Sequence, residues 1–257
     1  MGQMLVRQVL TTDGCDLAGG TEGPGHDALG QDVAATAGLE AAGLAITDDG
    51  DALFATADAI IDFTIAPVTQ VHTDLAVKHS TPLILGTTGH KDSQMASIEA
   101  AAKNVAIVKA MNFSVGVNVL FALTKQLAGT LDEDFDIEIV EMHHKHKVDA
   151  PSGTAIGLAQ AAADGRGVNL DDVADRGRDG ITGERQRGHI GLSALRGGDV
   201  VGEHDVVFAG ASERIKFSHI ATSREIFSKG AVRSAIWSQG KEPGLYDMLD
   251  VLGFSNV

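Results

Sequence analysis

The sequence has 257 residues, of which 44% are hydrophobic and 21% charged, a balance typical of a globular protein with one large domain or two of ordinary size. Its formal net charge is −15, from 35 acidic and 20 basic side chains. Such a surface repels nucleic-acid phosphates and anionic lipids, which argues against nucleic-acid and membrane partners. An anionic small molecule would therefore need a local cluster of basic side chains.

The cysteine content and the N-terminal residues bear on the cellular compartment. Cys15 is the single cysteine, so no internal disulfide can form, which fits a reducing environment. The first residues contain no basic segment followed by a long apolar one, and apolar runs such as Ala59-Ile60-Ile61 have the length of strands. These features predict a cytoplasmic protein.

The first half of the chain alternates short apolar runs with helical patterns, as βαβ units do. We expect strands over 58–63, 82–85 and 105–108, and helices over 67–79 and 93–103. In the first of these helices, Val71, Leu75 and His79 fall along one face. Strands that are apolar throughout favour a parallel sheet covered on both faces.

After Asn112 the pattern changes to a long helix over 115–131 and a strand over 136–142 whose polarity alternates with a period of two. Three β-rich segments joined by Gly-rich turns follow, over 189–195, 199–208 and 213–221, and favour a mostly antiparallel sheet. Residues 165–188 read as a long mobile loop, and 224–238 as a helix that returns to the first domain. We expect a dinucleotide-binding domain over 1–114, completed by 224–257, and a second domain over 115–223.

The start of the chain lacks part of a dinucleotide-binding unit. Residues 2–10 read as its first helix and 16–20 as its second strand, with Glu22 just past the end of that strand, where an acidic residue binds the adenosine ribose. The first strand and the Gly-rich phosphate loop that should precede this helix are missing. We therefore expect translation of the natural gene to start roughly 15–20 residues upstream. The alternative is that the helix opens a different fold without a dinucleotide site.

The densest polar segment follows the strand over 136–142. Three of the ten histidines lie within positions 143–146, and Lys145 and Lys147 accompany them. Imidazole can supply a proton near neutral pH, and a lysine can do so where a nearby cation or burial lowers its pKa. Ser152 is suited to cap a helix whose first turn, at Gly153 and Thr154, can bind a carboxylate. The segment thus predicts a site for an anion that must be protonated.

Two other interpretations of this segment stay open. His143, His144 and His146 could be zinc ligands of a metal-dependent hydrolase, although adjacent strand residues point apart and neither Glu141 nor Asp149 repairs that geometry. The segment could also be an exposed basic strand end without a function.

The order of several motifs identifies a resemblance. Residues 143–155, His-His-Lys-His-Lys-Val-Asp-Ala-Pro-Ser-Gly-Thr-Ala, resemble the signature of the dihydrodipicolinate reductases, now called 4-hydroxy-tetrahydrodipicolinate reductases. Further matching motifs lie at 61–64, 86–89, 112–118, 202–204 and 230–235, so the resemblance extends along nearly the whole chain.

This resemblance implies an α/β enzyme with a Rossmann-like parallel sheet, lacking its first strand, and an α+β domain for substrate binding and tetramerisation. The implied activity is the reduction, with NADH or NADPH, of a cyclic dicarboxylate, 4-hydroxy-tetrahydrodipicolinate, in diaminopimelate and lysine biosynthesis. A non-catalytic binding relative is an alternative, which the intact pair of His143 and Lys147 disfavours.

The resemblance also implies roles for individual residues. His143 is then the catalytic acid/base, Lys147 the proton donor, His144 a substrate contact, and Gly153 and Thr154 the carboxylate site; no metal is implied. The implied cofactor-binding residues are Glu22, Gly86, Thr87, Thr88, Ala110, Met111, Asn112 and Phe113. Gly23 stands where some relatives carry an arginine beside the ribose-binding acid, and Glu22 without a cation should repel a 2′-phosphate. We therefore predict a preference for NADH over NADPH in the full-length form.

Overall fold

The computed structural model describes residues 1–254, and the last three residues of the predicted segment 224–257 lie outside this range. The chain divides into two compact units, the first built from Met1–Ser114 and Glu225–Gly253 and the second from Val115–Arg224. No helix among the described residues is long and apolar enough to cross a membrane.

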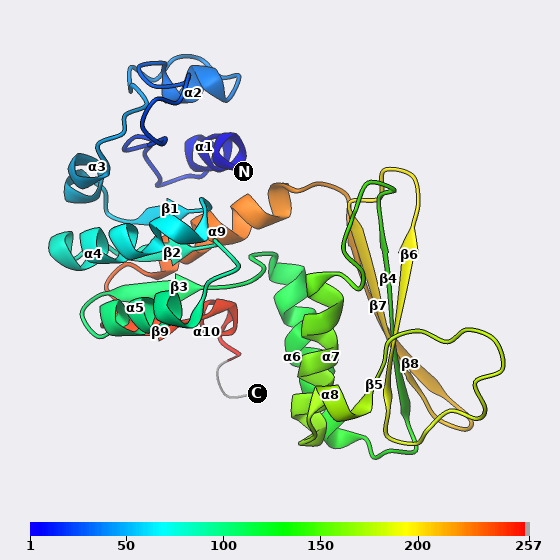
Figure 1. Ribbon diagram of the computed structural model, residues 1–257. Helices are drawn as coiled ribbons and strands as arrows, with labels where there is room; N and C mark the ends of the chain where they lie inside the picture. Colours follow the sequence, from blue (N-terminus) through cyan, green and yellow to red (C-terminus); the bar gives the residue numbers. More distant parts are fainter. Residues whose placement is uncertain (255–257) are drawn as a thin grey trace. The chain divides into compact units, whose positions relative to one another are not determined.

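The first unit is built on a parallel sheet (Figure 1). Its strands, in the spatial order β1-β2-β3-β9, are β1 (Ile60–Asp62), β2 (Leu83–Leu85), β3 (Ala106–Lys109) and β9 (Gly244–Tyr246). Its helices are α1 (Gly2–Leu10), α2 (Val33–Thr36), α3 (Gly50–Thr56), α4 (Thr69–His79), α5 (Asp92–Ala102), α9 (Glu225–Trp237), α10 (Met248–Leu252) and the 3-10 turn η1 (Ala66–Val68). The predicted parallel sheet and its three strands are confirmed.

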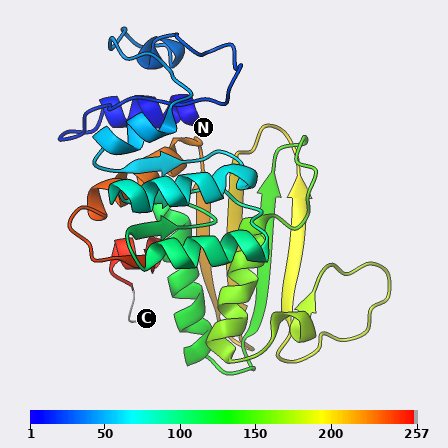
Figure 2. The ribbon, with the colours of Figure 1, turned by 60° about the vertical axis from the view of Figure 1, so that its left-hand side comes forward.

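The helices of this unit cover both faces of the sheet. Helices α4 and α5, which connect β1 to β2 and β2 to β3, lie on one face, and α9 lies on the other (Figure 2). The returning helix was predicted from its sequence and is confirmed as α9. The prediction for α4 needs a correction, because its buried side chains are Thr69, Thr73 and Ala76, whereas Val71 is 57% exposed.

The expected strand over 16–20 is wrong. Its only ladder contact is one bridge next to its end, between Thr21 and Thr47, in which Glu22 N donates to Thr47 O over 3.0 Å. A strand requires a ladder of hydrogen bonds to a neighbour, and no strand of the described sheets pairs with these residues. The segment that follows is held together by the Asp32 carboxylate. This carboxylate caps α2 and accepts hydrogen bonds from the backbone N–H groups of residues 42–44.

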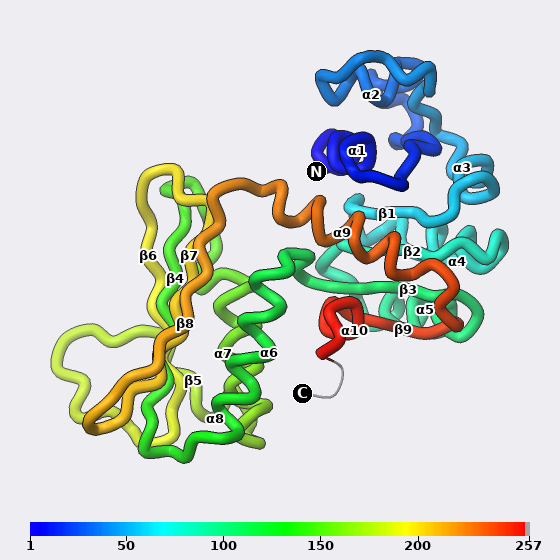
Figure 3. The backbone as a smooth tube through the Cα atoms, turned by 180° about the vertical axis from the view of Figure 1, so that it is seen from behind, coloured from blue at the N-terminus to red at the C-terminus, as the bar shows by residue number. Residues whose placement is uncertain are grey.

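The second unit packs two helices on one face of a five-stranded sheet (Figure 3). Its strands, in the spatial order β5-β6-β4-β7-β8, are β4 (Asp136–His143), β5 (Ala174–Asp175), β6 (Ile190–Arg196), β7 (Gly202–Ala209) and β8 (Arg214–Ala221). Its helices are α6 (Val115–Thr130), α7 (Gly153–Arg166) and α8 (Leu170–Val173). The predicted helix over 115–131 and alternating strand over 136–142 are confirmed as α6 and β4.

This sheet is mixed. Strand β7 pairs antiparallel with β4 and β8, as expected, but β6 lies on the other side of β4 and pairs with it in parallel. Residues 197–201 therefore do not form a hairpin turn between β6 and β7. Along β4 the burial alternates with every residue, so that Ile137, Ile139, Glu141 and His143 lie on the buried face. An acid and a histidine two residues apart consequently share that face.

The segment predicted as a long loop over 165–188 is partly regular. Its first part continues α7 and then forms α8 and β5, which leaves 176–189 without helix or strand. Two arginines of this remaining part bind acids of β4. Arg178 donates to both oxygens of Glu138, and Arg185 contacts Glu138 and Asp136. These ion pairs give the loop a defined place on the sheet.

Candidate active site

In the second unit the end of β4 brings together a buried acid and a histidine. Oε2 of Glu141 lies 2.6 Å from Nδ1 of His143. The carboxylate also accepts from Arg196, with Nη1 at 2.7 Å from Oε2 and Nη2 at 2.9 Å from Oε1, and from Ser152 N at 3.0 Å. Glu141 is only 1% exposed, so this acid is satisfied entirely by neighbouring protein groups.

The electrostatics of this group favour an ionised Glu141. Burial acts to raise the pKa of its carboxyl group, but the hydrogen bonds from Arg196, His143 and Ser152 N outweigh burial and hold the pKa below its usual range. The same interaction raises the pKa of Arg196 above its ordinary value. A carboxylate in these surroundings accepts hydrogen bonds and has no proton to donate.

His204 of β7 lies beside this pair. The rings of His143 and His204 are 5.2 Å apart at 75°, an edge-to-face arrangement, and His204 Nε2 lies 3.1 Å from Ser152 Oγ. Burial, followed by the charge of His143, lowers the pKa of His204 to about 4, so His204 is neutral near pH 7.

Ser152 caps α7 as predicted, because its hydroxyl accepts from Ala155 N over 3.1 Å. Gly153 and Thr154 are therefore the first two residues of that helix. A Cβ placed on Gly153 would meet no atom within 4 Å, so the space beside this helix start is open. Helix N-termini attract anions through their backbone N–H groups and the helix dipole.

The turn between β4 and α7 carries the remaining predicted residues. The ammonium of Lys147 lies 2.8 Å from Oδ1 of Asp149, and this hydrogen bond holds the pKa of the Asp149 carboxyl below its usual range. His144 is half-buried, and its ring centroid lies 6.2 Å from that of His146. Among residues 1–254 no group of three histidine, cysteine or acidic side chains is placed to hold a metal ion.

In the first unit the predicted cofactor residues Gly86 to Thr88 and Ala110 to Phe113 follow the carboxyl ends of β2 and β3. A side chain at Gly86 would overlap the ring of Phe63, which packs on this backbone. Thr88 and Met111 are exposed, Met111 to 73%. Ligands of parallel α/β sheets bind outside the carboxyl ends of the strands, where these residues lie.

Two of the predicted cofactor residues point into the protein. The Thr87 hydroxyl donates to Asp62 Oδ1 over 3.2 Å, and Asp62 Oδ2 lies 2.7 Å from His72 Nδ1. Phe113 is 1% exposed and packs on Phe63, with ring centroids 5.4 Å apart. Only the backbone of Thr87 and Phe113 can therefore face a ligand. Glu22 is exposed, after the bridge at Thr21.

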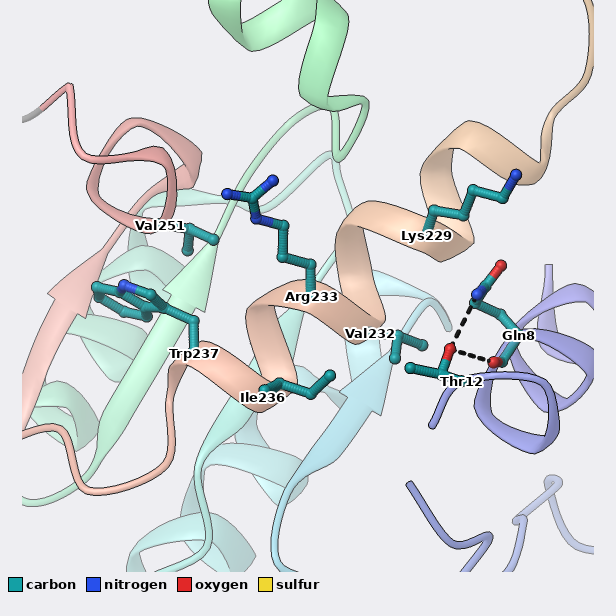
Figure 4. Close-up of a pocket in the computed structure, with 8 residues that line it drawn as sticks. All are labelled: Gln8, Thr12, Lys229, Val232, Arg233, Ile236, Trp237 and Val251. Atoms are coloured by element: carbon teal, nitrogen blue, oxygen red, sulfur yellow. Dashed lines mark hydrogen bonds between the residues drawn. The ribbon is translucent and has the colours of Figure 1, made fainter. Parts of the chain in front are cut away.

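A groove of about 400 Å³ also lies in the first unit, between α1 and α9 (Figure 4). Its walls include Trp237, Ile236 and Val232 of α9, with Gln8 of α1 and Thr12 of the turn after α1 opposite them. None of the predicted site residues lines it.

Sequence reasoning did not assign a functional role to Glu141, Arg196, Ser152 Oγ or His204 as partners of His143. One signal was available in the sequence. Glu141 and His143 occupy alternate positions of a strand whose other inward residues are apolar. The two-residue period of that strand therefore predicts that this acid and this histidine are buried on the same face. The contributions of Arg196 and His204 depend on the register, in which His143 is opposite Arg196 and Glu141 is opposite His204.

The two units together define a two-domain α/β protein, with a parallel sheet in one unit and a buried acid–histidine site in the other. Two family models match almost the entire chain: "Dihydrodipicolinate reductase, N-terminus" over residues 1–113 and "Dihydrodipicolinate reductase, C-terminus" over residues 116–252. The chain belongs to the dihydrodipicolinate reductase family, as the sequence motifs predicted.

Individual relatives agree with this assignment. The 4-hydroxy-tetrahydrodipicolinate reductase of Ruegeria pomeroyi is 56% identical over 98% of this chain and 94% of that protein. The protein of the same name from Parvibaculum lavamentivorans is 54% identical over 98% and 94%. A dipicolinate-bound dihydrodipicolinate reductase from Paenisporosarcina sp. TG-14 has a similar structure, with a TM-score of 0.76 and 25% identity over 97% of this chain and 94% of that one. These comparisons support the reductase over the metal-dependent hydrolase.

Proposed function

We propose that this protein reduces 4-hydroxy-tetrahydrodipicolinate to tetrahydrodipicolinate with NADH or NADPH, in the biosynthesis of diaminopimelate and lysine. The observation that carries the proposal is the pairing of His143 with the buried carboxylate of Glu141, next to the N-terminus of α7. The names of relatives more than 50% identical, and the dipicolinate bound to the similar structure, support this substrate class.

The second unit supplies the groups that such a substrate needs. A substrate carboxylate binds at Gly153 and Thr154, in the open space beside the start of α7. Loss of water from the hydroxylated ring leaves an unsaturated imine, and hydride addition to it leaves an electron-rich carbon–nitrogen system that must gain a proton. His143 is the acid/base for this step, Lys147 the proton donor and His144 a further substrate contact.

The first unit fits a pyridine nucleotide. Gly86, the exposed Thr88 and the exposed apolar Met111 lie at the carboxyl edge of the sheet, where the nicotinamide half would bind. Ala110 and Asn112 line the same edge, and Glu22 binds the adenosine ribose. When bound, the nucleotide supplies the hydride that the substrate ring accepts.

NADH is the preferred cofactor in this proposal. Glu22 is exposed and Gly23 beside it carries no cation, so a 2′-phosphate would be placed next to an uncompensated carboxylate. The ratio of kcat/KM for NADH to that for NADPH measures this preference, and Glu22→Gln should reduce the ratio. Equal values for the two cofactors would contradict it.

The family assignment and the second sheet also support a homotetramer. Leu195, Met142, Glu203 and Ile220 form one row across four strands, on the face opposite the buried one. Ile220 is 62% exposed and Leu195 51% exposed, a pair of apolar side chains that association would bury. Sedimentation of the protein and of Ile220→Lys tests this, because a charge in the interface should dissociate the tetramer.

The cytoplasmic location and the roles of the two units, cofactor binding in the first and substrate binding and oligomerisation in the second, belong to the same proposal.

A coupled assay tests the activity itself. The substrate is generated in the cuvette by an upstream enzyme, consumption of NADH is followed by absorbance, and the product is identified by mass spectrometry. Formation of tetrahydrodipicolinate together with oxidised cofactor supports the proposal. Absence of turnover with either nucleotide, from a folded protein that binds dipicolinate, would overturn it.

A further inference from the structure

The buried carboxylate of Glu141 is hydrogen-bonded through both of its oxygens. Its two oxygens accept four hydrogen bonds, from His143, from both Nη atoms of Arg196 and from Ser152 N, at 2.6–3.0 Å. These donors come from β4 itself, from the neighbouring strand β6 and from the start of α7. The carboxylate therefore has one position, defined from three directions.

This arrangement determines which nitrogen of His143 carries the hydrogen. An ionised carboxylate has no proton to give, so His143 Nδ1 must donate across the 2.6 Å contact. Nε2 is then the atom that holds or releases the second proton. Which nitrogen is protonated in a histidine is commonly set by the hydrogen bond that the other nitrogen makes.

Gly202 lies beside the Nε2 side of the ring, where a larger residue would crowd it. A Cβ at position 202 would lie 3.0 Å from His143 Nε2, and Gly202 has none. His204 contacts the same ring edge to face; it is neutral near pH 7, and its Nε2 lies 3.1 Å from Ser152 Oγ.

We propose that Glu141, clamped by Arg196 and Ser152 N, is a positioning residue that fixes the His143 ring and its tautomer so that Nε2 is the proton-transferring atom. This inference rests on the proposed function of His143 as the acid/base. Glu141 acts through His143 and is not itself a proton donor to the substrate.

Glu141→Gln tests the proposal, and Glu138→Gln is its matched control. Glu138 lies on the same strand and pairs with two arginines, Arg178 and Arg185, but it lies on the opposite face from His143. Two readouts are needed: kcat and KM in the coupled assay, and the ¹⁵N chemical shifts of the His143 ring, assigned with His143→Gln. We expect Glu141→Gln to lower kcat by about 100-fold with little change in KM, because general acid–base catalysis commonly contributes ~10²–10⁴-fold.

The spectra separate positioning from a merely structural role. In the unaltered protein Nδ1 should carry the hydrogen, in Glu141→Gln the two tautomers should mix, and Glu138→Gln should behave like the unaltered protein. Unchanged kcat in Glu141→Gln, or a loss of kcat without a change of tautomer, would refute the proposal.

Two further variants keep the test decisive if Glu141→Gln does not fold. Glu141→Asp keeps the charge but shortens the side chain, and Arg196→Lys keeps a cation but removes the two-pronged clamp. Both should lower kcat relative to the unaltered protein and give a partial mixture of the two His143 tautomers; a single unchanged tautomer in both would overturn the proposal. If the unaltered protein has no reductase activity, the proposed function fails, while the ring spectra still decide whether Glu141 sets the tautomer.

Discussion

His143 Nδ1 lies 2.6 Å from Glu141 Oε2, two residues earlier on the same strand. The period of a β-strand places both side chains on one face, and the sheet buries that face. The pair resembles the acid–histidine couples in which a buried carboxylate orients an imidazole for proton transfer.

Replacing His143 by Gln removes the group proposed to transfer the proton, while a side chain of similar size remains beside Glu141. We expect kcat to fall by about 10²–10⁴-fold, with the dissociation constant of the cofactor nearly unchanged. Steady-state kinetics and fluorescence titration with NADH measure the two quantities. His26→Gln, an exposed histidine of the first unit, is the control and should retain full turnover. Survival of turnover in His143→Gln would show that the acid is another residue.

Replacing Gly202 by Ala places a methyl group 3.0 Å from His143 Nε2, on the side proposed to face the substrate. Because small displacements of a reacting group can cost up to ~100-fold in rate, we expect kcat to fall by about 10–100-fold. Gly210→Ala is the control, since its Cβ would also meet an aromatic ring at 3.0 Å, that of Phe135, but just after the end of β7 that is distant from the histidines. Equal kcat values for the two variants would contradict a role of His143 Nε2 in the reaction.

The stability of the protein should depend on pH through His204. Its pKa is about 4 in the folded state, against an ordinary value of 6.5, because burial disfavours the imidazolium. Between pH 4 and pH 6.5 the unfolded chain therefore binds more protons at His204 than the folded protein does. The contribution of His204 to the free energy of unfolding is complete above pH 6.5 and is lost as the pH falls toward 4. The loss amounts to ~3 kcal/mol.

Urea unfolding across this range measures the effect, and His204→Asn should flatten the slope there. Glu141 and Glu138 have lowered pKa values, so their contributions are lost below their ordinary value of 4.5, in a lower pH window. A slope above pH 4.5 that is identical in His204→Asn would exclude His204 as its source.

Replacing Gly230 by Ala should destabilise the first unit. A Cβ at this position of α9 would overlap the carbonyl oxygen of Phe113, so the helix or the segment after β3 must move. Overpacking of this kind costs about 1–3 kcal/mol. Thermal unfolding followed by circular dichroism should show a lower Tm, whereas Gly23→Ala, where a Cβ meets nothing within 4 Å, should leave Tm unchanged. An unaltered Tm in Gly230→Ala would mean that the contact is readily relieved.

Much of this protein could be predicted from local sequence, because the relevant forces act over a few residues. The apolar runs at 60–61, 83–85 and 106–108 lie in parallel strands, and the alternation along 136–143 matches the burial of β4 residue by residue. The cap of α7 at Ser152 also follows from one side chain and the turn after it.

What the sequence could not supply are relations between distant segments. Residues 16–20 have the composition of a strand, but they lack a ladder partner within the described part of the chain. Val71 fits a helical apolar face, yet α4 buries its threonines instead. In both cases the outcome depends on which surface is opposite the segment, and this is decided by packing.

The candidate site shows the same division. The sequence by itself determined that His143, Lys147 and the start of a helix lie close together, because a strand end and a capped turn connect them. Only the tertiary structure decided that Arg196 and His204 join them. The register of β4 with β6 and β7 determines which residues of the neighbouring strands lie opposite His143 and Glu141. Register arises from the packing of whole strands, so a short motif cannot specify it.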